Sequence, residues 1–359
     1  MYKFLLLHPI MYLLRKKISL WTIAVVALNL VTSQPLGAQE ATDHDTSYYK
    51  AYPRHLLGRF YFSRKYTNVV LGAPRNEPRL RYRPNTTLNM GVGATYRGFT
   101  LNLAYGFPFL NQNSDRGKTR YLDLQSHLYT RKWSYDFWGQ LYKGYYLRSD
   151  WLKDLTGDRF YLRPDIGVTL LGFSTYHILQ NRTFSYRATF IQDEWQVRSA
   201  GSWLIGGEMY YGRVSADSAF VPELIGDGYG QKGVEKLRFM DFGPGIGYAY
   251  NWVYQKNLFM GLAATINLNL GFVKESGEGV QHSQITFSPN FIYRATAGYN
   301  SEKWTASLSL VGNRVSTSGA NTSYNYVIST GNYRATLAYR FLPGKKIKKV
   351  LEPLDRLKQ

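Results

Sequence analysis

The segment LFMGLAATINLNLGF, residues 258–272, contains no charged residue. Its apolar side chains recur at every second position from Leu258 to Phe272, while most of the intervening residues are small or polar. Side chains alternate between the two faces of a strand, whereas a helix would mix the two sets on every face. A helical membrane span also requires roughly 20 consecutive apolar residues. The segment therefore predicts a β-strand with one continuous apolar face.

The same alternation recurs from about residue 59 to residue 342. TLNMGVGATY (87–96) and FTLNLAYGF (99–107) are separated by two residues, which predicts a hairpin. Short turns alternate with long polar loops, as in outer-membrane barrels, where the short turns face the periplasm. The other short turns are predicted at 130–132, 180–182, 254–257 and 300–303, and the long loops at 72–86, 108–119, 148–160, 215–236, 273–283 and 315–325.

This pattern predicts an all-β fold, an antiparallel transmembrane β-barrel of about twelve strands with both ends in the periplasm. Residues 183–214 are too long for one crossing, since roughly 9 to 11 residues span the bilayer. We therefore expect RSAGS (198–202) to be a bulge, a fold into the lumen or an extra hairpin. An extra hairpin would give the alternative of about fourteen strands.

Aromatic residues on the apolar parity gather beside the predicted short turns. A soluble β-sandwich has the same alternation but no reason to concentrate aromatic rings at one end of its strands. Aromatic rings favour the membrane interface, so their position favours the barrel. The predicted interface aromatics are Tyr96, Phe99, Trp133, Tyr135, Trp252, Tyr299 and Trp304.

The N-terminus has the pattern of a cleaved signal peptide. Basic residues 15–17 precede the apolar run ISLWTIAVVALNLV, and Leu36 and Ala38 suit cleavage after Ala38. The alternative, an anchoring helix, would need a longer apolar run. The predicted organisation is a signal peptide at 1–38, a periplasmic segment at 39–58, the barrel at 59–342 and a basic periplasmic tail at 343–359. The tail is either a solvated extension or a short amphipathic helix lying on a membrane.

Composition narrows the classes of partner and site. The 359 residues include no Cys, which excludes disulfides, thiolate metal sites and a lipoprotein anchor. The formal charge is +20, and it becomes +16 when residues 1–38 are removed with their four Lys and Arg and no acid. Aromatic residues lie on strand faces rather than beside clusters of Lys and Arg, so nucleic acid is not an expected partner. Anionic lipid, including lipopolysaccharide, or polysaccharide fits this charge better.

The tetrapeptide YRAT occurs at 186–189, 293–296 and 333–336. In strands, its Tyr and Ala would face lipid and its Arg and Thr would face the lumen. One interpretation is an anion-attracting constriction, because charged rings set pore selectivity. The other is a lumen closed by Arg paired with acids such as Asp136, Asp193 or Glu208, because unpaired buried charge is costly. The predicted lumen-lining residues are Arg187, Arg294, Arg334, Arg340, Asp123, His127 and Asp241.

The sequence has no motif that indicates catalysis, a cofactor or a metal site. Asp123, Gln125 and His127 share the lumen parity of LDLQSHL, but the adjacent Ser126 points to the opposite face. We therefore interpret His127 as a hydrogen-bonded lumen histidine and predict that the protein is not an enzyme.

Several stretches resemble an uncharacterised outer-membrane barrel family of Bacteroidota, described as a domain of unknown function. They are DTSYYKAY with FSRKYT, YRPNTTLNMGVGATYRGFTLNLAYGF, GKTRYLDLQSHLY with DFWGQLYKGYYL, and FSYRATFIQDEWQVRSAGSWLIGG, within residues 45–340. The resemblance implies a single barrel in the outer membrane of a Gram-negative bacterium and assigns no activity or site residue. The basic tail departs from barrels that end on an aromatic strand residue, so the barrel-assembly machinery would have to recognise the internal YRF at 339–341.

The predicted function is a passive channel or uptake protein, a monomer that passes small solutes, including anionic ones, through an arginine-lined lumen. The alternative is a non-conducting barrel that binds surface polysaccharide or lipid through its long loops. A lipid-modifying enzyme is the least favoured hypothesis.

Overall fold

A computed structural model describes residues 43–73, 77–110, 115–148, 160–225, 228–319 and 325–356. The predicted signal peptide at 1–38 lies outside the described residues. The compact unit that begins at His44 is built almost entirely from antiparallel strands. None of the described helices is long and apolar enough to cross a membrane.

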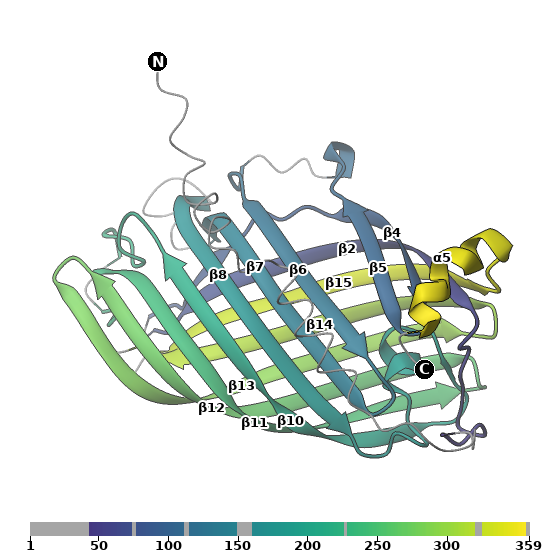
Figure 1. Cartoon of the computed structure of the whole chain (residues 1–359). Helices are drawn as coiled ribbons and strands as arrows, with labels where there is room; N and C mark the ends of the chain where they lie inside the picture. Colours follow the sequence, from purple (N-terminus) through teal and green to yellow (C-terminus); the bar gives the residue numbers. More distant parts are fainter. Residues whose placement is uncertain are drawn as a thin grey trace. The chain divides into compact units, whose positions relative to one another are not determined.

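Consecutive long strands form one regular wall (Figure 1). Burial alternates along β12 as the sequence predicts: Leu268 is 67% exposed, whereas Asn269 is 1% exposed. The apolar residues therefore face outward and the small and polar ones face inward. The strands are β10 (Ala200–Ser215), β11 (Val234–Tyr254), β12 (Leu258–Gly277), β13 (Val280–Asn300), β14 (Trp304–Ser318) and β15 (Asn325–Phe341).

The N-terminal half forms a less regular wall that includes shorter strands. Its strands are β1 (Tyr49–Lys50), β2 (Leu56–Leu71), β3 (Leu80–Arg83), β4 (Asn89–Tyr96), β5 (Phe99–Tyr105), β6 (Arg120–Tyr129), β7 (Trp133–Arg148), β8 (Phe160–Ile178) and β9 (Trp195–Gln196). The helices are a 3-10 turn at Pro108–Leu110, α4 (Tyr186–Phe190) and α5 (Lys345–Arg356).

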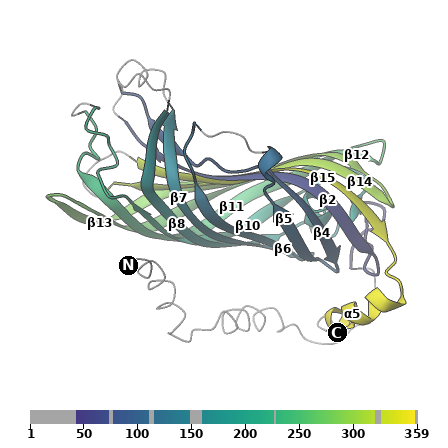
Figure 2. The ribbon, with the colours of Figure 1, turned by 90° about the horizontal axis from the view of Figure 1, so that it is seen from above.

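The barrel closes because β15 pairs with β2 along nearly the whole of both strands. The hydrogen-bonded ring contains ten strands, in the order β2, β3, β7, β8 and then β10 to β15. Near the long loops, the short β3 bridges β2 and β7. Toward the short turns, β4 and β5 extend from β2, and β6 extends from β7 (Figure 2).

The predicted strand count needs correction. Each of the twelve predicted crossings contains a strand of at least 7 residues, but the continuous ring has ten strands rather than twelve or fourteen. Among the described residues no pairing joins β5 to β6, so these strands and β4 remain side strands of a ring that β3 completes.

Residues 183–199 fold into the lumen instead of continuing a strand. The first YRAT is the helix α4, capped by Ser185, whose side chain accepts a hydrogen bond from the Ala188 N–H at 2.9 Å. Tyr186 is therefore buried inside, not on the lipid face as predicted. Asn251 of β11 donates to the Thr189 hydroxyl at 3.0 Å, which holds α4 against the inner wall. The other two YRAT segments lie in β13 and β15.

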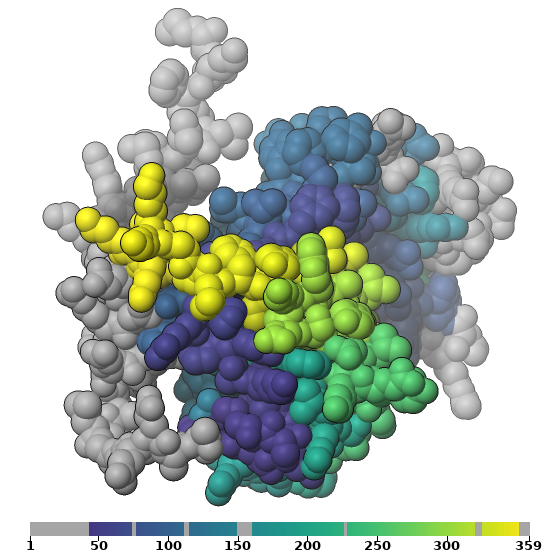
Figure 3. Space-filling model, turned by 90° about the vertical axis from the view of Figure 1, so that its right-hand side faces the viewer, coloured from purple at the N-terminus to yellow at the C-terminus, as the bar shows by residue number. Residues whose placement is uncertain are grey.

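Two apolar clusters occupy the interior, one near each end of the strands. The cluster near the long loops includes residues of the β10–β11 loop that fold inward: Phe220, Val221, Ile225 and Tyr229. The cluster near the short turns packs Phe184 and Tyr186 against inner residues of the wall, including Tyr129, Tyr176 and Ile178. Figure 3 faces this end and shows the purple N-terminal residues packed beside teal and green atoms of the barrel.

The outer face carries the predicted interface aromatics with one exception. Trp133, Trp252, Tyr299 and Trp304 are each at least 36% exposed. Phe99 and Tyr135 are half-buried. Tyr96 is the exception, at only 6% exposed; its register partners are Leu56 of β2 and Phe99 of β5. The basic tail forms the helix α5, and its contact with a membrane stays a prediction.

Candidate functional site

A layer of buried polar side chains fills the barrel between the two apolar clusters. The Tyr176 hydroxyl of β8 donates to Asn267 Oδ1 of β12 at 2.7 Å. Asn313 Nδ2 of β14 donates to the Tyr210 hydroxyl of β10 at 2.7 Å. These strands are not neighbours in the ring, so each hydrogen bond crosses the lumen. Both asparagines have no exposed surface.

An ion pair joins β13 to β7 across the interior of the barrel. Arg294 Nη2 of β13 lies 2.6 Å from Asp136 Oδ2 of β7, and their side chains are 2% and 0% exposed. His127 Nδ1 lies 2.7 Å from the other Asp136 oxygen. Arg294 Nη1 donates to the Tyr186 hydroxyl at 2.9 Å, which connects the ion pair to α4. The charge of Arg294 is thus neutralised inside the protein.

Arg187 is paired with acids of its own inward segment. Its Nη2 lies 2.6 Å from Asp193 Oδ2, and its Nη1 lies 3.0 Å from Glu194 Oε1. Burial opposes the charge of Arg187, but the two carboxylates outweigh burial and hold the pKa of this guanidinium above its ordinary value. Arg187 lies on the inward helix α4, not on a strand facing the lumen as the alternation predicted.

Arg334 and Arg340 are held without a carboxylate among their described contacts. Arg340 Nη1 donates to the carbonyls of Ser301 and Glu302 at 2.6 and 2.8 Å, and Nη2 donates to the Gln192 carbonyl at 2.6 Å. Arg340 also stacks on the Tyr52 ring, with its guanidinium 4.2 Å from the ring centroid. The guanidinium of Arg334 stacks on Tyr61 at 4.6 Å.

The two predicted lumen acids differ in their contacts. Asp123 accepts hydrogen bonds from Lys65 Nζ at 3.2 Å and from the Tyr142 hydroxyl at 2.6 Å. Asp241 is 1% exposed, and its Oδ2 has no hydrogen-bond partner among the described residues. No group of three or more His, Cys, Asp or Glu that could hold a metal ion occurs in the described part of the chain.

The sequence reasoning missed part of this interior. Glu194 and the inward Tyr186 were not predicted to lie there, although the adjacent acids of IQDEW (191–195) follow Arg187 closely. That proximity, within a stretch already too long for one crossing, is the signal that could have identified a self-paired inward segment.

One family model covers most of the chain. Residues 43–341 match the family model described as Domain of unknown function (DUF4421), so the chain belongs to this family. A comparison with curated proteins returned no match.

Solved structures that resemble the chain are bacterial outer-membrane proteins. The outer membrane protease OmpT from Escherichia coli has a TM-score of 0.38 at 10% identity, covering 83% of this chain and 100% of its own. The toluene transporter TodX of Pseudomonas putida has a TM-score of 0.27 at 7% identity, covering 80% and 90%. The COG4313 outer membrane channel of Pseudomonas putida F1 has a TM-score of 0.22 at 10% identity, covering 85% and 100%. At these scores and identities, the likenesses carry no argument about this chain.

Proposed function

We propose that this protein is an outer-membrane β-barrel whose lumen is closed by its own residues, a non-conducting barrel rather than a passive channel. The observation that carries the proposal is the buried Asp136–Arg294 pair, which joins β7 to β13 across the interior. The cross-lumen hydrogen bonds and the apolar clusters near both ends support it. A barrel of this size can be filled by its own side chains.

The outer surface supports placement in a membrane. Large apolar residues face outward from β12, β13 and β14, with Leu268, Phe287 and Leu308 at least 67% exposed. A soluble protein rarely exposes an apolar band that runs across several strands. Trp252 and Trp304 lie on the same face near the short turns, where an outer-membrane barrel meets the periplasmic interface.

An anion-selective channel would need accessible, unpaired arginines along an aqueous path. Arg294 and Arg187 instead have carboxylate partners, and Arg340 binds three backbone carbonyls. These contacts favour the closed interpretation of the inward arginines over the constriction. Surface binding through the β10–β11 loop is also less favoured, because Phe220 and Tyr229 of this loop are buried in the core.

Conductance of the refolded mature chain in a planar bilayer tests this proposal. We expect no discrete current steps from this protein under a salt gradient. A known porin, measured in the same bilayers, is the positive control and should give such steps. Discrete steps from this protein would contradict a closed lumen. If the steps also favoured anions and Arg294→Glu reversed that preference, the arginine-lined channel would replace the proposal.

A further inference from the structure

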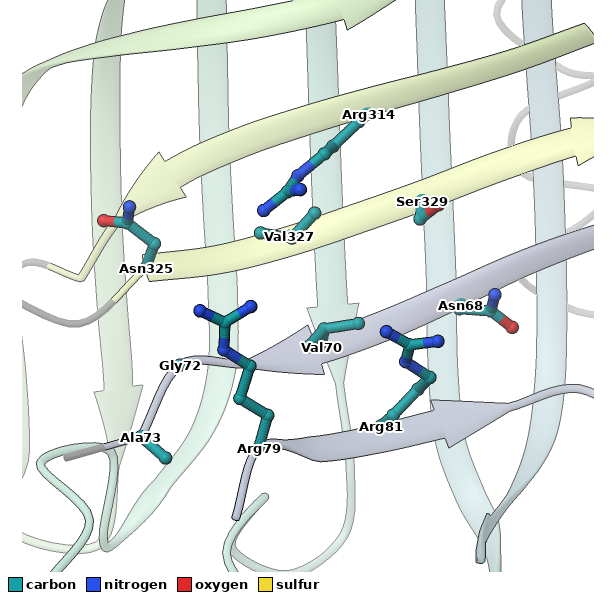
Figure 4. Close-up of a pocket in the computed structure, with 10 residues that line it drawn as sticks. All are labelled: Asn68, Val70, Gly72, Ala73, Arg79, Arg81, Arg314, Asn325, Val327 and Ser329. Carbon is teal, nitrogen blue, oxygen red and sulfur yellow. The ribbon is translucent and has the colours of Figure 1, made fainter. Parts of the chain in front are cut away.

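Two adjoining hollows lie on the outer face of the barrel, toward the long loops. The first has a volume of about 310 Å³ and is lined from β2, β3, β14 and β15 (Figure 4). The second has a volume of about 530 Å³ and shares Asn68, Arg81 and Ser329 with the first. Side chains alternate along β2 and β15, and Asn68 and Ser329 belong to the sets that point away from the lumen. We call the two hollows together the outer basic groove.

Positive charge dominates the outer basic groove. Neither hollow has an acidic residue in its lining. No ion pair joins any of its arginines to a carboxylate within the described ranges. In Figure 4, three of the guanidinium groups extend over the same hollow from β14 and from the segment around β3. The arginines that line the groove are Arg64, Arg79, Arg81, Arg83, Arg116 and Arg314.

Tyrosine rings lie beside the arginines on the same outer face. Tyr66 and Tyr333 stack with centroids 5.5 Å apart. The Tyr293 ring packs directly over Gly312: a Cβ added to Gly312 would lie 2.1 Å from the Tyr293 ring, so only glycine leaves room for it. The groove is therefore lined by amphipathic rings that suit a membrane interface, next to cations that suit the head-group region.

We propose that the outer basic groove binds the phosphate groups of a phosphorylated lipid in the outer leaflet, of the lipid A type. The planar fork of arginine matches phosphate oxygens in a bidentate way, and several arginines without acidic partners form a phosphate site. With short turns in the periplasm, the long-loop end lies at the outer leaflet. The inference rests on the outer-membrane placement of the proposed function but not on the state of the lumen.

The experiment measures lipid adducts on the folded mature protein by native mass spectrometry. The probes are lipid A, the same lipid without its phosphates, and inorganic phosphate as a competitor. The test variant is Arg81→Gln/Arg314→Gln. The control is Arg238→Gln/Lys274→Gln, which removes two charges from outward-facing positions of β11 and β12 that also lie toward the long loops.

We expect lipid A to bind the wild type and the control at least tenfold more tightly than the test variant. Removing the phosphates from the lipid should weaken binding to the wild type by a similar factor. Equal binding of the two lipids, or an equal loss in the control variant, would overturn the proposal. If inorganic phosphate displaced bound lipid A when both were present at the same concentration, the ligand would be free phosphate rather than a lipid, and the proposal would be overturned. A wild type that conducts ions but binds lipid A selectively would overturn only the closed lumen.

Discussion

The arginines that point into this barrel and those on its outer face differ in their surroundings. Inside, Arg294 meets Asp136 and Arg187 meets Asp193 and Glu194, all largely buried. Outside, Arg81 and Arg314 line a hollow without a single acid. The net charge of the sequence does not distinguish these two groups. Their partners do: Arg294 and Arg187 are paired with carboxylates, whereas none of the groove arginines has a carboxylate partner among the described residues.

This difference has an energetic consequence. Removing one partner of a buried pair leaves an uncompensated charge, whereas removing an exposed cation costs little. The inner arginines should therefore control stability, and the outer ones should control ligand binding. Four predictions follow this difference, ordered from the largest expected effect on stability to the smallest; the third concerns the inward β10–β11 loop rather than an arginine.

The largest effect is expected for Asp136→Ala, which leaves Arg294 buried without its carboxylate. The free energy of unfolding should fall by about 3–5 kcal/mol. Denaturant unfolding in detergent micelles, followed by tryptophan fluorescence, measures it. The double variant Asp136→Leu/Arg294→Met removes both charges and should recover most of the loss. A loss below about 1 kcal/mol in the single variant would mean that the pair is not buried.

Arg340→Gln should lower the free energy of unfolding by about 1.5–3 kcal/mol, because the charged hydrogen bonds to the Ser301, Glu302 and Gln192 carbonyls are lost. The same unfolding measurement applies. Arg238→Gln, at an exposed outer position, is the matched control and should be neutral. Equal effects of the two substitutions would mean that the contacts of Arg340 with the β13–β14 turn, Gln192 and Tyr52 do not stabilise the fold.

Tyr229→Phe should cost about 0.5–1.5 kcal/mol, because its hydroxyl donates to the Pro78 carbonyl at 2.5 Å and holds the β10–β11 loop near the long-loop end. Burial raises the pKa of Tyr229 to about 12, so this donor keeps its proton at neutral pH. Tyr211→Phe, on the exposed outer face, should have no effect in the same assay. A stability unchanged by Tyr229→Phe would place the loop away from the core.

Arg81→Gln/Arg314→Gln should change the free energy of unfolding by less than about 0.5 kcal/mol, since neither side chain has an acidic partner in the lining of the groove. Unfolding in lipid-free detergent measures this. A loss of unfolding free energy comparable to that of Asp136→Ala would show that the outer arginines also stabilise the fold. The inner and outer arginines would then not differ in role.

Local pattern predicted the strands but not how they combine. Strict alternation in β12 and the two-residue turn before Phe99 identified strands and hairpins, because side-chain period and turn length are local properties. The identical tetrapeptide YRAT forms a helix at 186–189 and strands at 293–296 and 333–336. Its surroundings decide the outcome: Ser185 caps the helix, whereas Tyr293 packs over Gly312.

The candidate site could be predicted only in part. Alternation placed Arg294 inside, but its partner Asp136 is distant in the chain, and one sequence does not reveal that pairing. The outer basic groove had a local signal, since RLRYR places Arg79, Arg81 and Arg83 on one face. Arg314 contributes because β14 lies beyond β2 and β15 from β3 in the closed ring, an arrangement that only the fold supplies.

Accessibility of the lumen to water tests the central claim most directly. The chain has no Cys, so Ser174→Cys inside the barrel and Ser283→Cys on its exposed surface each introduce a single thiol. With a small charged thiol reagent on the folded protein, Ser283→Cys should react at once. Ser174→Cys, which is fully buried beside Asp136, should react only after denaturation. Equally rapid labelling of both thiols in the folded protein would contradict a closed lumen.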